Sequence, residues 1–368
     1  MATQLRYESV DPFTIALAVS GLVFLVGGAD VLVRGASGLA KGFGLSPLVI
    51  GLTVVAYGTS MPELAVSTAA SLQGQADVAL GNVVGSNIFN VLFILGVSAL
   101  ITPLAVAWTL VWLDVWVMVG ASVLVVLLGA DGRISRIEGL ALFVGCVAYT
   151  AWLLWQSRRN GAASQERSTS DTDLPPVWRS VAQVMIGLAL LVVGAKWLVD
   201  GAVLLARLVG VSELVIGLTI IAAGTSLPEV AASVAASLRG ERDIAVGNVV
   251  GSNIFNILAV LGGSAAISSA GVAVSASALA FDVPVMVAVA VACLPVFFTG
   301  HRIDRWEGIL FLGYYLAYIV YLALDATRSE ALESYRLAMI WFALPLTVVT
   351  LATVTVRYVR AGRRNTER

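Results

Sequence analysis

Charged residues are scarce in this sequence and make up 12% of its 368 residues. A soluble domain typically carries about 25%, so this chain lacks the polar groups needed to cover its surface in water. Hydrophobic residues reach 59% instead, and the mean hydropathy is +0.92. These values exclude a soluble enzyme and a disordered chain, and they indicate a protein whose main partner is the lipid bilayer.

Excess basic charge, cysteine and histidine are also lacking. The formal net charge of −1 supplies no positive field for a phosphate backbone, which excludes nucleic acid as a partner. The two cysteines, Cys146 and Cys293, form no Cys-x-x-Cys pair, so neither a disulfide framework nor a zinc site is indicated. The single histidine, His301, excludes a metal site built from histidines. We expect no cofactor.

Apolar runs long enough to span a membrane recur along the chain. A helix needs about 20 residues to cross a hydrocarbon core of about 30 Å. Eleven runs qualify, at 13–35, 45–71, 77–101, 114–130, 138–156, 180–204, 211–238, 244–268, 278–299, 306–325 and 336–357. Because they are continuous rather than alternating, they predict an all-α polytopic membrane protein. No basic stretch leads the first run, so we expect it to be retained rather than cleaved.

One long polar stretch, residues 157–178, divides these runs and predicts a linker between two membrane halves. Lysine and arginine favour the cytoplasmic side of a membrane. With the N-terminus placed outside, 15 of the 22 basic residues fall inside. The chain is therefore expected in the plasma (inner) membrane as a monomer, with a cytoplasmic linker and a cytoplasmic C-terminus.

Residues 51–90 and 217–256 repeat one sequence at an offset of 166 without a gap, and 28 of their 40 positions are identical. Each half, 13–156 and 179–325, then holds five spans, and 336–357 is an extra eleventh helix. Because five is odd, the second half enters the membrane from the opposite side. Inverted repeats of this kind are common in secondary transporters, where the substrate binds at the midplane between the halves.

The best-matched part of the repeat interrupts two apolar runs. It reads Gly58-Thr-Ser-Met-Pro-Glu63 in the first half and Gly224-Thr-Ser-Leu-Pro-Glu229 in the second. Proline removes a backbone donor and clashes with the carbonyl four residues earlier. We therefore expect a break in each helix, with free backbone carbonyls at membrane depth, which is tolerated only beside protein or a water-filled cavity.

A glutamate follows each predicted break. An ionised glutamate in the bilayer centre costs several kcal/mol, with about 2.5–3.5 as the low estimate, and no lysine or arginine lies in the neighbouring turns. A protonated, hydrogen-bonded glutamate is the structural alternative, but it does not explain two symmetric copies beside two broken helices. A cation held between Glu63 and Glu229 explains both.

Other oxygen-bearing side chains share helix faces with these glutamates or with one another. The i,i+4 pairs are Thr59 with Glu63, Thr225 with Glu229, Ser86 with Asn90, and Ser252 with Asn256. Hard cations such as Ca²⁺ take 6–8 oxygen ligands, and two carboxylates match the charge of one divalent ion. Without that ion the carboxylates repel each other, so protons or Na⁺ should replace it, and this mutual exclusion is the basis of antiport.

Several nearby polar residues have more than one interpretation. The amides of Asn82 and Asn248 either orient the broken helices or contact the ion directly. Asn87 and Asn253 are expected behind the ion ligands. Asp114 and Asp282 are predicted to cap the fourth and ninth spans, unless those spans begin earlier and bury them.

At these motifs the sequence resembles the Ca²⁺/cation antiporter superfamily, specifically prokaryotic Na⁺/Ca²⁺ exchangers, over residues 13–325. The paired Gly-Thr-Ser-x-Pro-Glu and Gly-Asn-Val-Val-Gly-Ser-Asn-Ile-Phe-Asn motifs carry the resemblance. It implies ten core helices and alternating access by sliding of the first and sixth spans. It also implies that Glu63 and Glu229 bind Ca²⁺ and Na⁺. The implied lining of the ion sites comprises Thr59, Ser60, Ser86, Thr225, Ser226, Ser252 and the carbonyls of Ala56 and Ala222.

The sequence departs from the pattern of the best-understood exchangers at Asn256, where they carry aspartate. The predicted site is therefore symmetric, with two glutamates and two asparagines, which leaves the Na⁺ stoichiometry and the choice of Na⁺ over H⁺ open. The proton-coupled branch carries glutamate where this chain has Gly85 and Gly251, which argues against that branch.

The leading hypothesis is an antiporter that extrudes Ca²⁺ using inward Na⁺ flow. The nearest alternative is the same fold with Ca²⁺/H⁺ or K⁺-assisted exchange. A cation channel, from a different functional class, would use the same oxygens without a counter-ion. An intramembrane enzyme is disfavoured because the sequence offers no Ser/His or paired-Asp arrangement.

Overall fold

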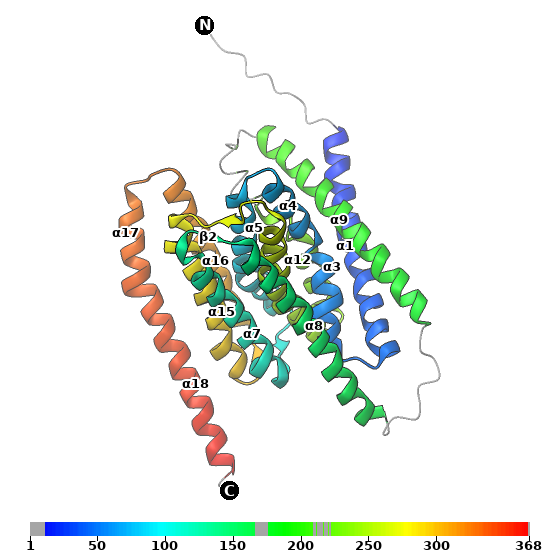
Figure 1. Cartoon of the computed structure of the whole chain (residues 1–368). Helices are drawn as coiled ribbons and strands as arrows, with labels where there is room; N and C mark the ends of the chain where they lie inside the picture. The colour runs from blue at the N-terminus through cyan, green and yellow to red at the C-terminus, as the bar shows by residue number, and fades with distance from the viewer. Residues whose placement is uncertain are drawn as a thin grey trace.

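The computed structural model describes residues 12–165, 176–208, 211, 216, 220 and 222–366. Its long helices run side by side along one direction, and the first described helix starts at the opposite end of the bundle from where the last one finishes (Figure 1). Nine helices among the described residues are long and apolar enough to cross a membrane. A tenth span is possible where Pro47–Thr59 and Met61–Leu72 meet at a bend of 46°. The predicted all-α membrane class is therefore confirmed.

The first half contains mainly helices and two very short strands. Its elements are α1 (Pro12–Phe43), α2 (Pro47–Ile50), η1 (Gly51–Val55), α3 (Ala56–Thr59), α4 (Met61–Leu72), α5 (Ala76–Phe89), η2 (Asn90–Leu95), α6 (Gly96–Ile101), β1 (Leu104–Ala105), η3 (Leu110–Asp114), α7 (Val115–Leu128), η4 (Gly129–Asp131), β2 (Arg133–Ile134) and α8 (Arg136–Gln165).

The second half repeats this order. Its elements are α9 (Val177–Leu208), α11 (Ala222–Gly224), α12 (Leu227–Leu238), α13 (Arg242–Phe255), η6 (Asn256–Leu261), α14 (Gly262–Ile267), β3 (Val272–Ala273), η7 (Ala278–Asp282), α15 (Val283–Phe298), β4 (Arg302–Ile303) and α16 (Arg305–Ala326). The final helix follows as α17 (Ala331–Ala338), η8 (Met339–Ala343) and α18 (Leu344–Thr366). Part of the predicted span 211–238 lies outside the described residues, at 212–215, 217–219 and 221.

The two long first helices of the halves, α1 and α9, pack against each other in antiparallel fashion (Figure 1). Gly21 of α1 meets Gly194 of α9, whereas Gly35, further along α1, meets Ser180 at the start of α9. At the crossing, a Cβ added to Gly28 would lie 2.9 Å from the carbonyl oxygen of Gly187. Glycine permits this close approach between membrane helices.

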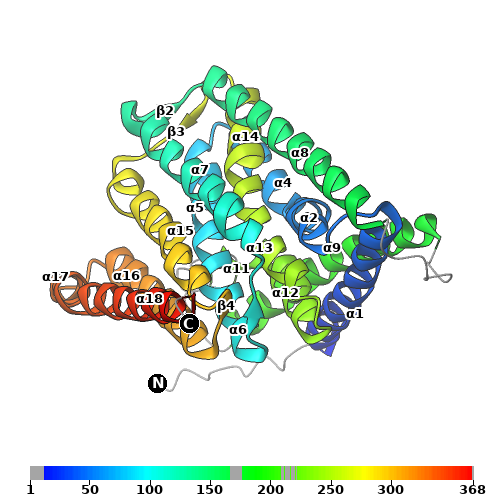
Figure 2. The same ribbon diagram turned by 90° about the horizontal axis from the view of Figure 1, so that it is seen from below.

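The centre of the bundle is formed by α5 and α13, which are surrounded by the other helices (Figure 2). The most apolar stretch of the Arg242–Ile267 span is completely buried. At the bundle ends, short antiparallel ladders join the halves, since β1 pairs with β4 and β2 with β3. Each ladder thus joins a strand of one half to a strand of the other half that is not its counterpart, since the repeat matches β1 to β3 and β2 to β4.

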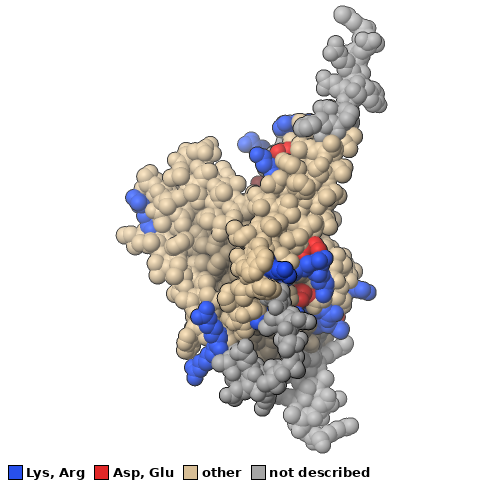
Figure 3. Space-filling view, turned by 90° about the vertical axis from the view of Figure 1, so that its right-hand side faces the viewer, with Lys and Arg blue, Asp and Glu red and all other residues tan. Residues whose placement is uncertain are grey.

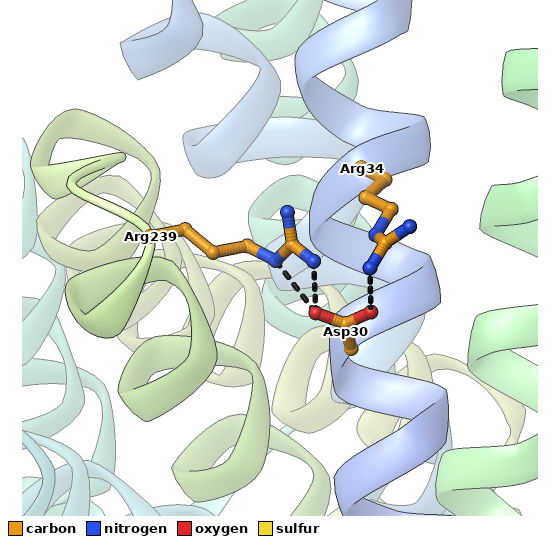
Figure 4. A network of polar contacts seen from close by, with 3 residues as sticks. All are labelled: Asp30, Arg34 and Arg239. Atoms are coloured by element: carbon orange, nitrogen blue, oxygen red, sulfur yellow. Dashed lines mark hydrogen bonds and ion pairs between the residues drawn. The ribbon is translucent and has the colours of Figure 1, made fainter.

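The outer surface is largely uncharged, with charged side chains gathered in patches (Figure 3). One such patch joins α1 to the turn after α12. There Asp30 lies between two arginines, accepting a hydrogen bond from Arg239 Nε at 2.7 Å and pairing with Arg34 at 2.8 Å (Figure 4). The Ser37 hydroxyl of α1 also donates to Glu241 at 2.7 Å. These bonds, called the α1 clasp below, attach α1 to the α12–α13 turn.

Two boundaries differ from the sequence prediction. Helix α8 continues to Gln165, so the first part of the predicted linker is helical, and the Arg159 guanidinium packs over the Trp155 ring at 5.6 Å. Residues 166–175 of that linker lie outside the described part. The helix before α7 begins by Leu110, so Asp114 is not a cap.

Asp114 is instead 3% exposed and accepts a hydrogen bond from Tyr149 at 2.7 Å. Its counterpart Asp282 is half-buried and accepts a hydrogen bond from Tyr318 at 3.0 Å, in a helix that has already begun by Ala278. The cap prediction was therefore wrong for both aspartates, because each has a tyrosine partner on another helix that removes the need for water.

Candidate functional site

Both predicted helix breaks are present. In the first half, Ser60 separates α3 from α4 with φ −83° and ψ 10°, and in the second Ser226 precedes α12 with φ −91° and ψ 7°. Pro62 and Pro228 occupy the first turn of the new helix, where a missing backbone N–H removes no hydrogen bond. Each break therefore places its glutamate in the first turn of a helix, where the helix dipole favours a carboxylate.

The two glutamates are held by serines of the opposite half. Ser226 Oγ donates to Glu63 Oε1 at 2.8 Å, and Ser60 Oγ donates to Glu229 Oε1 at 2.7 Å. Glu63 is 0% exposed and Glu229 is 1% exposed. Neither carboxylate takes part in the salt bridges formed within the described residues. The crossed bonds bring the two breaks together into a single buried site.

Four buried oxygens of this site have no hydrogen-bond partner among the described residues. They are Oε2 of Glu63, Oε2 of Glu229, Oδ1 of Asn90 and Oδ1 of Asn256. Buried polar groups are nearly always paired, and leaving one unpaired costs about 1–3 kcal/mol, more for a charged group. The four unpaired oxygens form two pairs related by the repeat. They therefore indicate a bound species that is coordinated by oxygen atoms, as a hard cation is.

The hydroxyls predicted for the site lie around these oxygens. Ser86 Oγ lies 3.2 Å from Ser226 Oγ, and Ser252 Oγ lies 3.5 Å from the carbonyl oxygen of Ala56. The Thr59 hydroxyl lies within hydrogen-bond distance of the Val55 carbonyl oxygen, at 3.0 Å. These contacts join Glu63 to Ser226 and Ser86, and Glu229 to Ser60, while Thr59 and Ser252 both lie beside the Ala56 carbonyl. The hydrogen bonds of Thr225, Asn90 and Asn256 go instead to the asparagines Asn82, Asn253 and Asn87.

The sequence predicts that the amides of Asn82 and Asn248 either orient the broken helices or contact the ion. Their hydrogen bonds support the first interpretation. Asn82 Nδ2 donates to the Glu63 carbonyl at 3.2 Å and to Ser67 Oγ at 2.9 Å. In the second half, Asn248 Nδ2 contacts the Glu229 carbonyl at 3.3 Å and Ser233 Oγ at 2.8 Å. Their Oδ1 atoms accept from the threonines of the opposite half. Each asparagine therefore fixes the helix that carries a glutamate.

Sequence reasoning missed the two serines that anchor these asparagines. Ser67 and Ser233 are fully buried, lie four residues after the glutamates and differ by the repeat offset of 166. That shared spacing on the glutamate face of the helix is the signal that could have identified them. They complete a symmetric frame behind the carboxylates.

The donor set contains oxygen only. The described residues contain no cluster of three or more His, Cys, Asp or Glu side chains that could hold a metal ion. Neutral hydroxyls and amides therefore complement the two carboxylates, which together carry at most two negative charges. Such a site suits Ca²⁺ or Na⁺ better than a soft transition metal.

Known proteins share this architecture. The sodium/calcium exchanger protein family matches residues 13–155 and 179–324, that is, both halves without the final helix. The putative antiporter CaxA of Alkalimonas amylolytica is 41% identical over 304 residues, covering 81% of this chain and 95% of that protein. The inner membrane protein YrbG of Escherichia coli is 40% identical over 322 residues, covering 84% and 95%.

Two relatives carry sodium and calcium in their names. The sodium/calcium exchanger MaX1 of Methanosarcina acetivorans is 36% identical over 342 residues, covering 82% of this chain and 96% of that protein. The solved structure of the sodium-calcium exchanger NCX_Mj, soaked with Na⁺ and Ca²⁺, superimposes with a TM-score of 0.72 at 33% identity, covering 84% of this chain and 98% of that one. This chain is a membrane transporter and not an enzyme, and it belongs to the sodium/calcium exchanger protein family.

Proposed function

We propose that this protein is a secondary active transporter that exchanges Ca²⁺ for Na⁺ by alternating access, and that it extrudes Ca²⁺. The observation that carries the proposal is the set of four unpartnered oxygens, two carboxylate and two amide, contributed equally by the two halves. Ca²⁺ takes 6–8 oxygens, so these four need two to four more. The hydroxyls of Thr59, Thr225, Ser86 and Ser252 and the Ala56 and Ala222 carbonyls are the candidates for them.

Antiport follows from the charge of the site. Two buried carboxylates repel each other and require about two positive charges nearby. One Ca²⁺ supplies them, and so do Na⁺ ions in its place, but both together would exceed the charge that the site can neutralise. Ca²⁺ and Na⁺ therefore bind in alternation, which couples their movements when only the loaded carrier changes access.

Alternating access also requires two arrangements of nearly equal energy. The antiparallel packing of α1 on α9, which are equivalent helices of the two halves, supports an inverted repeat of five helices each. Exchanging the roles of such halves opens the site to the opposite side. The basic-residue distribution favours an outside N-terminus, and an inner-membrane location agrees with that of the relative YrbG, an inner membrane protein.

The deciding experiment uses purified protein in proteoliposomes preloaded with Na⁺, K⁺ or acid, with radiolabelled Ca²⁺ outside. We expect Ca²⁺ uptake that depends on internal Na⁺ and stops when the Na⁺ gradient is removed. Equal uptake without any opposing cation gradient would contradict antiport and favour a channel.

The nearest alternative differs only in the counter-ion. It is supported by Asn256. The best-understood prokaryotic Na⁺/Ca²⁺ exchangers carry aspartate at this position and so have three carboxylates, whereas this site has two. Ca²⁺/H⁺ or K⁺-assisted exchange would need fewer Na⁺ ions for charge balance. Uptake driven by internal acid alone, or uptake that requires K⁺ together with Na⁺, would support this alternative in the same assay.

A further inference from the structure

Four asparagines form a buried hydrogen-bonded cluster beside the glutamates. Asn90 Nδ2 donates to Asn253 Oδ1 at 3.0 Å, and Asn256 Nδ2 donates to Asn87 Oδ1 at 3.1 Å. All four side chains are at most 2% exposed. Each of these bonds joins a residue of one half to a residue of the other half, as the serine–glutamate bonds do.

The amides of Asn87 and Asn253 have a fixed orientation. Asn87 Nδ2 donates to the Asn253 carbonyl at 3.3 Å and lies 3.6 Å from Met286 Sδ. Asn253 Nδ2 donates to the Asn87 carbonyl at 3.4 Å and lies 3.5 Å from Met118 Sδ. Carbonyls and thioethers can only accept. A reversed amide would therefore set an oxygen against two acceptors, where no hydrogen bond can form.

This fixed orientation dictates the orientation of the two site asparagines. Asn253 presents Oδ1, an acceptor, to Asn90. Asn90 must therefore donate with its Nδ2, which points its own Oδ1 away from Asn253. The same holds for Asn256 opposite Asn87. The oxygens turned away are the two unpartnered amide oxygens of the site.

We propose that Asn87 and Asn253 are positioning residues for cation binding, because they force Asn90 and Asn256 to present oxygen rather than N–H to the bound ion. This inference rests on the proposed cation site. A reversed Asn90 or Asn256 amide would direct two N–H donors at the cation, which removes a ligand and adds repulsion. Each positioning residue acts across the two halves: Asn253 orients Asn90, and Asn87 orients Asn256.

Because Asn87 acts on Asn256 and not on its near neighbour Asn90, the proposal predicts a specific pattern of coupling between variants. A merely structural role of Asn87 would not produce that pattern. Ca²⁺ binding to the purified full-length protein is measured by calorimetry for Asn87→Leu, Asn256→Leu, Asn90→Leu and the two double variants that contain Asn87→Leu. Residues that act through one contact show non-additive effects. We expect each single variant to raise the Kd for Ca²⁺ by about tenfold or more, equivalent to about 1.4 kcal/mol.

In the double variants, Asn87→Leu with Asn256→Leu should bind no more weakly than the worse single variant. Asn87→Leu with Asn90→Leu, only three residues apart, should show the product of the two effects. Coupling to Asn90 without coupling to Asn256, or an unchanged Kd in Asn87→Leu, would overturn the proposal. Wild-type protein that binds no Ca²⁺ would instead contradict the proposed function, so the two failures are distinguishable.

Two further variants guard against a folding defect. Asn87→Asp keeps an oxygen that accepts from Asn256 Nδ2, and its second oxygen, protonated in this buried position, donates to the Asn253 carbonyl as Nδ2 does. It should therefore bind Ca²⁺ about as tightly as wild type. Weaker binding by Asn87→Asp would contradict the positioning role. Ser98→Ala removes another buried polar group, one on α6 without a hydrogen-bond partner in the described chain, and should leave the Kd unchanged.

Discussion

Helices α4 and α12 have nearly the same sequence and the same glutamate, yet their surroundings differ. On α12 only Leu238 is exposed, whereas α4 exposes Met61, Ala65, Val66, Ala69 and Leu72. The reason is that α1 and α9 both pack on α12, while neither makes comparable contact with α4. A cavity of about 570 Å³ lies beside α4 instead, lined by Met61 and Leu64 among others.

This difference shows that near-identical sequences do not enforce identical positions in an inverted repeat. The site itself is symmetric, because its bonds cross between the halves, but the α1–α9 pair can cover only one of the two equivalent helices at a time. Under the proposed alternating access, we expect a second arrangement in which α1 and α9 lie on α4. With the proposed orientation, in which the N-terminus is outside, α4 lies at the outer end of its span. We therefore expect the arrangement in which α4 is uncovered to give access from outside.

The largest expected effect comes from removing either carboxylate, which breaks the symmetric site. Glu63→Gln and Glu229→Gln should each abolish Ca²⁺ exchange, because the ion loses half of its balancing charge. Breaking a buried charge pair costs about 3–5 kcal/mol, which is roughly a hundredfold or more in Kd. Radiolabelled Ca²⁺ uptake measures this loss, with membrane insertion checked by size-exclusion chromatography. Normal exchange by either variant would remove the site assignment.

A second prediction addresses the asymmetry directly. In a background where buried Cys146 and Cys293 are replaced by alanine, the protein is labelled with a polar maleimide in permeabilised proteoliposomes, so that the reagent reaches both membrane faces. Ala65→Cys on α4 should react readily. Ala231→Cys, at the equivalent position of α12, should stay largely unlabelled because α1 and α9 cover that helix. Equal labelling of the two positions would mean that the α1–α9 pair does not favour α12 in the membrane.

A third change makes the site less symmetric. Asn256→Asp adds a carboxylate, so Ca²⁺ transport should persist while displacement of Ca²⁺ by Na⁺ becomes steeper, since more Na⁺ ions are needed for charge balance. The measurement is Ca²⁺ binding against Na⁺ concentration, with wild type as the reference. An unaltered Na⁺ response would count against a role for residue 256 in the counter-ion choice.

The α1 clasp should have a smaller effect on the balance between the two arrangements. Arg239→Gln removes its ion pair with Asp30, and the equivalent position on the other side is the neutral Gln73. Partly exposed ion pairs contribute about 0.2–1 kcal/mol, so Ala231→Cys labelling should rise by about two- to fivefold. Arg302→Gln, which removes a separate pair with Asp304, serves as the matched control. If Arg239→Gln and Arg302→Gln changed the labelling equally, the α1 clasp would have no specific role in the balance between the two arrangements.

The smallest effect is expected from the part that lies outside both halves. The family match ends at residue 324, and α17–α18 packs on the outside of α16 through bonds such as Tyr335 to the Ala317 carbonyl. A chain ending after Ala326 should keep its exchange rate and lose a few degrees in Tm. Loss of exchange in folded truncated protein would show that the final helix belongs to the transport mechanism.

Much of this molecule was predictable because its information is local or repeated. Apolar runs of membrane-spanning length gave the helices, Pro62 and Pro228 gave the breaks, and the repeat offset singled out Glu63 and Glu229. The crossed pairing of Ser60 with Glu229 was not predictable, because a symmetric repeat does not say which half supplies the partner.

The burial of Asp114 escaped prediction for a related reason. The apolar residues before it continue without a break, so the start of the helix has no local signal, and its partner Tyr149 lies on a different helix. The choice of α12 over α4 is likewise a property of packing, which sequences so alike cannot encode on their own.

The most direct test of the account is the number of Ca²⁺ ions that the protein binds and their response to Na⁺. Equilibrium binding of radiolabelled Ca²⁺ to purified protein should show one ion per chain, because both halves contribute to a single site, and this binding should fall to zero as Na⁺ rises. Two Ca²⁺ ions per chain, or Ca²⁺ that remains bound at saturating Na⁺, would contradict a shared site with mutually exclusive occupancy.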